Sequence, residues 1–190
     1  MTGYSFALFF HLVFVLVATA AAALTTFAAL RLRRVTSAAE AAPWLALNGT
    51  VVPAFPVAVL GLLATGIYMT HARWTWSTPW IDAALFGLGL IVVLGSGIER
   101  SRGNALRRAL ASSEMSMRAQ RLLRDPVSWT AKMTTLTLVV AIVFVMTVKP
   151  MAGKCVAAFV LAAVAGVLGA VPIWYAPRAT ETERTNPASP

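Results

Sequence analysis

The sequence predicts an all-α protein, a polytopic transmembrane helix bundle, and three observations predict it. The chain has 190 residues, of which 58% are hydrophobic and 12% charged, whereas a soluble domain carries about 25% charged residues. Its mean hydropathy is +0.74. Five apolar stretches are long enough to cross about 30 Å of hydrocarbon, which takes about 20 helical residues. Backbone polar groups in lipid must be satisfied within their own segment, so these stretches are expected to be helices.

The predicted spans form one transmembrane domain over residues 1–178, with a four-helix core and a fifth, C-terminal helix. The spans are expected at 4–30, 51–72, 80–98, 129–149 and 155–175. The first span is expected to be a retained anchor and not a cleaved signal, because no Lys or Arg precedes Arg31. The polar segment 179–190 is expected to be a disordered tail.

The cations lie in alternate loops, which predicts the orientation. The net charge of +9 comes from 16 Lys and Arg against 7 Asp and Glu. The first loop carries Arg31, Arg33 and Arg34, the second only Arg73, and the fourth Lys149 and Lys154. Because cytoplasmic loops are rich in Lys and Arg, we expect a bacterial inner-membrane protein with its N-terminus outside and its C-terminus inside. Tryptophans agree with this orientation: Trp74, Trp76 and Trp80 are expected at the outer interface, and Trp44, Trp129 and Trp174 at the inner one.

The third loop, residues 99–126, is expected to be a basic, amphipathic helix on the cytoplasmic side. Leu106, Leu110 and Met117 recur at helical spacing beside an arginine face. We expect this helix to lie on the anionic leaflet; the alternative is a docking surface for an acidic partner. The arginines concerned are Arg100, Arg102, Arg107, Arg108, Arg118, Arg121 and Arg124. The composition excludes a nucleic-acid partner.

Prolines and small residues predict the boundaries and packing of the helices. Thr78 before Pro79 predicts the N-cap of the third span, and Pro56 is expected to kink the second span or delay its start. Helices associate in lipid through small residues and interhelical hydrogen bonds. The fifth span carries such residues at four-residue spacing: Ala158, Ala162, Gly166 and Ala170. The third span offers Ala83, Gly87, Gly89, Gly95 and Gly97.

Polar residues inside a span are candidates for function, because they are costly in lipid. His11 shares a face of the first span with Ala18 and Ala22, so it is expected to point into the bundle. His71 and Asp82 are expected in the same outer half of the membrane. Such a cluster predicts a haem or metal site with His11 and His71 as ligands and Asp82 orienting an imidazole.

A purely structural interpretation of the two histidines, in which neither binds a metal, stays open. In it, His11 hydrogen-bonds a threonine or a backbone carbonyl, and His71 is an interfacial residue. Whether His71 lies at the same depth as His11 depends on where the second span enters the membrane. If that span enters the membrane at Val51, His71 lies about 10 Å above His11; if Pro56 delays the entry, the difference shrinks to a few ångströms.

Three segments carry a family resemblance. The first span contains FALFFHLVF at residues 6–14, the second LATGIY at 63–68, and the fourth ends in FVMTVKP at 144–150. Residues 5–150 thereby resemble small bacterial membrane proteins of unknown function that are related to the HemJ-type protoporphyrinogen oxidases and the CopD-type copper-resistance proteins. The resemblance implies that His11 matches a histidine associated with haem b.

The chain also departs from these relatives. Arg124-Asp125-Pro126 stands where the HemJ proteins carry Asn-Glu-x-Pro, and the first span has no Trp, so oxidase activity is not carried over. The chain also lacks a run of Met or His ligands, so the sequence gives little support for copper transport. The function expected is therefore the binding of haem b or another hydrophobic redox cofactor through His11. The alternatives are an accessory or assembly subunit bound to a larger membrane-protein complex and, third, a transporter of small solutes or copper.

Overall fold

The computed structural model describes residues 3–110 and 117–175, and all regular elements there are helices. They are α1 (Gly3–Leu32), α2 (Ala38–Val51), α3 (Ala54–Arg73), α4 (Pro79–Val93), the π-helix η1 (Leu94–Glu99), α5 (Arg100–Leu110), α6 (Met117–Leu123), α7 (Pro126–Val148) and α8 (Ala152–Trp174). Five stretches of this helical chain are long and apolar enough to cross a membrane. The expected all-α bundle is confirmed, and the protein is a multi-pass membrane protein. The expected tail 179–190 and the side chain of Arg118 lie outside the described residues.

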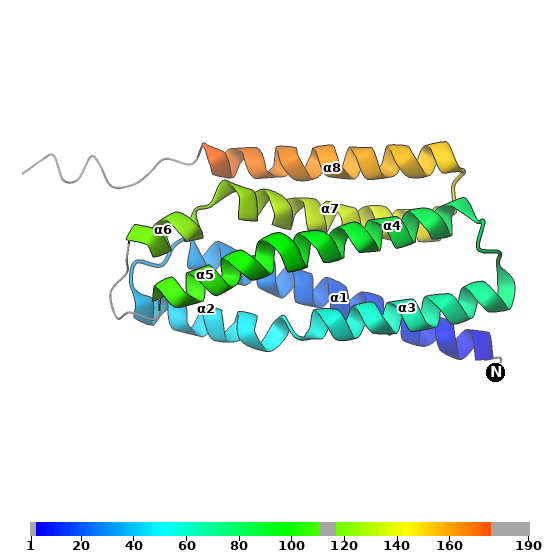
Figure 1. Ribbon diagram of the computed structural model, residues 1–190, viewed down its shortest axis with the longest axis horizontal. Helices are drawn as coiled ribbons and strands as arrows, with labels where there is room; N and C mark the ends of the chain where they lie inside the picture. The colour runs from blue at the N-terminus through cyan, green and yellow to red at the C-terminus, as the bar shows by residue number, and fades with distance from the viewer. Residues whose placement is uncertain (1–2, 111–116, 176–190) are drawn as a thin grey trace, which may run out of the picture.

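The long helices run side by side and alternate in direction (Figure 1). The α1–α2 connection, α5, α6 and the last turn of α8 lie at one end, which we call the arginine-rich end. The start of α1 and the α3–α4 and α7–α8 connections lie at the opposite end. The arrangement thus collects the arginine clusters of the first and third loops at one end of the bundle, as the loop pattern predicts.

The second span is preceded by a helix that the sequence analysis did not anticipate. Ser37 caps α2, with its hydroxyl accepting the amide N–H of Glu40 at 3.3 Å, and the Glu40 carboxylate accepts the amide N–H of Thr36 at 2.9 Å. This is a variant of the capping box. The interruption between α2 and α3 falls at Val52 and Pro53, and Pro56 lies inside the first turn of α3, where a missing N–H costs nothing.

The third span continues into the basic loop. Through η1, α5 prolongs α4 as one rod and does not turn aside to lie across it (Figure 1). No proline interrupts residues 80–110, so the helix propagates past its expected end at residue 98. Thr78 and Pro79 begin α4 as expected, although the Thr78 hydroxyl donates to the Thr75 carbonyl at 2.6 Å and does not cap the helix through its side chain.

Helices α7 and α8 form the most extensive helix pair, and small residues explain their closeness. A Cβ added to Gly166 would lie 2.5 Å from the Thr134 Cα and 2.8 Å from the Thr137 hydroxyl. Ala162 and Ala170 of the same stripe are buried, which confirms the expected packing face of α8. On α4, Gly87 makes room for the Phe159 ring, whereas a Cβ at Gly89 of α4, or at Gly95 or Gly97 of η1, would meet nothing within 4 Å.

The helices fall into two groups. In the first group α1 packs along α3 and α2, and in the second α7 packs along α8 and α4. Contact between the groups is slight: α1 meets α7, and the Arg107 side chain of α5 lies beside Gly49 of α2. His11 and its surroundings belong to the first group, so the geometry of the candidate site is decided by the pair α1 and α3.

Candidate functional site

The close approach of α1 and α3 positions the site. Gly61 of α3 leaves the space that the Phe14 ring of α1 occupies, and a Cβ there would collide with that ring. Five residues further along α3, a Cβ on Gly66 would lie 3.7 Å from the His11 Cε1. The two glycines thus bring the first helix against the third, with the imidazole between them.

Within this interface the His11 Nδ1 lies 2.8 Å from the Thr65 hydroxyl oxygen. The same hydroxyl lies 2.6 Å from the Gly61 carbonyl and 3.3 Å from the Leu62 carbonyl. A carbonyl only accepts, so the single proton of the Thr65 hydroxyl is donated to α3's own backbone. Thr65 therefore accepts from His11, and Nδ1 is the nitrogen that carries the proton. In a neutral imidazole this leaves the lone pair on Nε2.

Two expectations about His11 are met. The ring is half-buried and faces another helix, as the small residues on its face predict. It also hydrogen-bonds a threonine, which is the structural reading that the sequence left open. The residues one turn to either side on α1, Ala7, Leu8 and Val15, are all apolar, so the imidazole has no charged neighbour on its own helix.

The structure does not bring His71 to His11. Thr65 is level with His11, and His71 lies six residues further along α3, which is about 9 Å at 1.5 Å per residue. His71 is exposed in the last turn of α3, and Asp82 is exposed in the first turn of α4. Among the described residues no three His, Cys, Asp or Glu side chains are grouped so that they could hold a metal ion. His11 is thus separated from His71 along the bundle axis, and the three predicted site residues do not form a metal-binding group.

At the opposite end of the bundle, cationic side chains lie over aromatic rings. The guanidinium of Arg73 lies 4.6 Å from the Tyr4 ring centroid, and the Lys149 ammonium lies 4.6 Å from that of Trp74 and 5.5 Å from that of Trp80. The Trp74 and Trp80 rings meet edge to face at 5.0 Å. The grouping of these tryptophans was expected from the sequence; their cationic partners were not, because ring–cation pairs join residues far apart in the chain.

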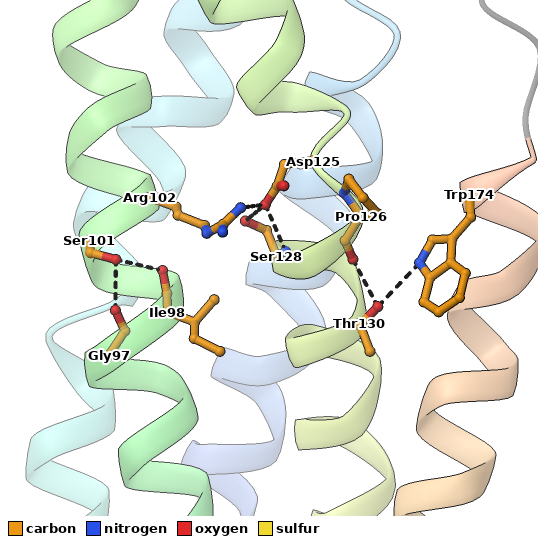
Figure 2. A network of polar contacts seen from close by, with 9 residues as sticks. All are labelled: Gly97, Ile98, Ser101, Arg102, Asp125, Pro126, Ser128, Thr130 and Trp174. Carbon is orange, nitrogen blue, oxygen red and sulfur yellow. Dashed lines mark hydrogen bonds and ion pairs between the residues drawn. The ribbon is translucent and has the colours of Figure 1, made fainter.

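At the arginine-rich end, Asp125 joins two helices. Its carboxylate accepts the amide N–H of Ser128 at 2.9 Å and the Ser128 hydroxyl at 2.7 Å, and it forms an ion pair with Arg102 of α5 (Figure 2). Nearby, the Trp174 indole N–H donates to the Thr130 hydroxyl at 3.2 Å and ties the end of α8 to α7. The other arginines of the third loop whose side chains are described are exposed: Arg100, Arg107, Arg108, Arg121 and Arg124.

Comparisons with protein-family models, with curated proteins and with solved structures gave no match. The function is therefore argued from the site itself. Thr65 is the residue that sequence reasoning did not single out. Its signal is a hydroxyl in the apolar middle of the second span, one turn after Gly61 and directly before Gly66, where a partner helix can approach closely.

Proposed function

We propose that the protein holds haem b, or a comparable hydrophobic redox cofactor, with His11 as axial ligand. The observation that carries the proposal is the hydrogen bond between the His11 Nδ1 and the Thr65 hydroxyl at 2.8 Å. A metal-binding histidine commonly donates its second ring N–H to a fixed acceptor, which sets both the tautomer and the orientation of the ring. The inferred tautomer keeps the Nε2 lone pair for a metal.

The residues present fit ligation by one histidine and do not favour ligation by two. His71 lies about 9 Å further along the bundle axis and is exposed, so it is left out of the proposed ligand set, and Asp82 with it. A bound haem would supply one-electron redox chemistry. The chain's own contribution is that Thr65 holds the imidazole and that Phe14 and the apolar neighbours on α1 keep water from it.

The proposed location is a bacterial inner membrane, with the arginine-rich end in the cytoplasm. Cytoplasmic loops carry the excess of Lys and Arg, and the α1–α2 connection, α5 and α6 hold half of this chain's 16 Lys and Arg residues. In this orientation His11 lies in the outer half of the membrane. The family expected from the sequence remains part of this proposal: His11 and the LATGIY segment, two pieces of the resemblance, meet in the contact between His11 and Thr65.

The test is the absorption spectrum of the full chain purified in detergent after expression with ample haem precursor. We expect a Soret band and a positive pyridine haemochrome assay for the wild type, and their loss in the His11→Ala variant. The matched control is His71→Ala, which removes the chain's other histidine and is expected to keep the spectrum. A wild type without haem, or equal haem content in the two variants, contradicts the proposal.

A second candidate function is that of an accessory subunit. The observation that favours it is the slight contact between the α1–α3 group and the α4–α7–α8 group, together with large apolar side chains exposed on α1, among them Phe6, Phe9 and Leu16. Purification from native membranes in mild detergent separates the candidates. A stoichiometric complex with another membrane protein supports the subunit, whereas a monodisperse single chain that carries haem supports the cofactor-binding protein.

A further inference from the structure

A second polar arrangement lies at the arginine-rich end, where the end of α1 meets the start of α7. The guanidinium of Arg33, which directly follows α1, lies 5.5 Å from the centroid of the Trp129 ring. Arg33 is half-buried, and Trp129 is only 6% exposed. The two residues come from segments nearly a hundred positions apart, so the bundle as a whole creates this contact.

The indole N–H of Trp129 is buried and has no hydrogen-bond partner among the described residues. Its counterpart on α8, Trp174, is by contrast satisfied by the Thr130 hydroxyl. A buried donor without an acceptor destabilises the fold, and an indole nitrogen can only donate. The indole N–H of Trp129 therefore needs a hydrogen-bond acceptor, and an anionic oxygen would be the strongest acceptor.

The positive charges near Trp129 also favour an anionic partner. Burial lowers the pKa of the Arg33 guanidinium, and the nearby positive charge of Arg124 lowers that pKa further. Of the carboxylates whose side chains are described at this end, Asp125 is engaged by Arg102 and Ser128, and Glu40 by Thr36. Among the described residues, neither of them forms an ion pair with Arg33 or Arg124.

We propose that Arg33, Arg124 and the indole N–H of Trp129 bind the phosphate of an anionic phospholipid headgroup. Guanidinium groups match the geometry of phosphate oxygens and stay charged at all physiological pH values. A phosphate between Arg33 and Arg124 would relieve their mutual repulsion and give the indole its acceptor. This inference is independent of the cofactor proposed at His11.

The position in the bundle favours a lipid over a soluble anion. Arg33 follows the last residue of one span, and Trp129 lies in the first turn of another, so both are expected at headgroup level, where tryptophan is enriched. Basic pockets between transmembrane helices are known binding sites for anionic headgroups. The site differs from the exposed arginines of α5, because it includes a buried donor and a half-buried guanidinium and is not a uniformly charged surface.

The test uses native mass spectrometry of the full chain in detergent, titrated with phosphatidylglycerol or with phosphatidylcholine of the same acyl chains. We expect the wild type to retain phosphatidylglycerol preferentially. The double variant Arg33→Gln/Arg124→Gln should lose about tenfold or more in its apparent affinity, since it removes both charge-assisted contacts to the phosphate. The matched control, Arg107→Gln/Arg108→Gln on α5, removes the same charge and should change the affinity little.

Trp129→Phe keeps an aromatic ring beneath Arg33 and removes only the donor, so it decides the matter if the double arginine variant does not fold. We expect it to lower retention of phosphatidylglycerol severalfold. Equal binding of the two lipids by the wild type, or an equal loss in the α5 control, would overturn the proposal. Titration with inorganic phosphate distinguishes the source: saturation by phosphate that the lipid cannot displace would assign the site to a soluble anion and overturn the lipid.

Discussion

The Lys149 ammonium lies 4.6 Å from the centroid of the Trp74 ring, although Lys149 ends α7 and Trp74 follows α3. Lys149 is also the one described non-glycine residue with a positive φ, at 53°. Its left-handed backbone ends α7 by directing the amide N–H to the Val145 carbonyl at 2.9 Å. One residue thus terminates a helix and joins two connections at the opposite end of the bundle.

These two roles predict different outcomes for two substitutions at Lys149. Lys149→Met removes the cation and keeps the left-handed strain, so it should destabilise the protein by about 0.5–1 kcal/mol, the usual range for an exposed cation–π contact. Lys149→Gly loses the same contact but relieves roughly 1 kcal/mol of left-handed strain, and it should be close to neutral. Thermal unfolding in detergent, followed by circular dichroism, measures both. A glycine variant less stable than the methionine variant would contradict this account.

Two glycines of α8 give a matched test of the α7–α8 interface. A Cβ at Gly166 meets the backbone of Thr134 at 2.5 Å, whereas at Gly169 it meets nothing within 4 Å. We expect Gly166→Ala to destabilise the protein by about 1–3 kcal/mol, as overpacking does, and Gly169→Ala to be neutral or slightly stabilising because alanine favours a helix. The shift in the midpoint of unfolding compares them. Equal shifts would mean that this face of α8 is not the contact with α7.

The existence of five apolar spans could be predicted from the sequence because hydropathy acts locally, but the end of the third span at residue 98 could not, because the helix continues through η1 into α5. The helix α2 was missed, although Ser37 and Glu40 carry a capping-box pattern, because its apolar residues continue into the next span without a clear boundary. The inward orientation of His11 followed from its alanine-rich face. Its partner Thr65 could not be derived, since the depth at which α1 meets α3 depends on where Phe14 and Gly61 interlock.

Three substitutions in the Asp125–Arg102 contact at the arginine-rich end are expected to lower the stability of the protein by different amounts. Asp125→Ala removes both the cap of α7 and the ion pair with Arg102 (Figure 2), and losing a capping side chain alone costs about 0.5–2 kcal/mol. Asp125→Asn keeps an oxygen for Ser128 and should cost less. Arg102→Gln should cost least, because the Arg102 side chain is 36% exposed and solvent-exposed ion pairs contribute little. Unfolding in detergent should return this order; a larger loss for Arg102→Gln than for Asp125→Ala would refute it.

Thr65 provides a test of the candidate site that leaves His11 in place. Thr65→Val keeps the shape and removes the acceptor of Nδ1, while Thr65→Ser keeps the hydroxyl. We expect the valine variant to lose about 0.6–1.7 kcal/mol of stability, the range for interhelical hydrogen bonds in membranes, and to retain less haem than the serine variant under the same expression. If the valine variant keeps its stability and its haem while the serine variant loses them, the methyl group of Thr65 and not its hydroxyl holds the interface.

Labelling of single cysteines tests the proposed orientation. Cys155 is buried, and its replacement by Ser gives a background in which Thr36→Cys and Ser77→Cys each introduce one exposed thiol at opposite ends of the bundle. With the arginine-rich end in the cytoplasm, a membrane-impermeant maleimide should label the Ser77→Cys variant in intact spheroplasts and the Thr36→Cys variant only after permeabilisation. The reverse pattern would invert the topology and place His11 in the cytoplasmic half. Labelling of both variants from one side would mean that the chain from 36 to 77 does not cross the membrane.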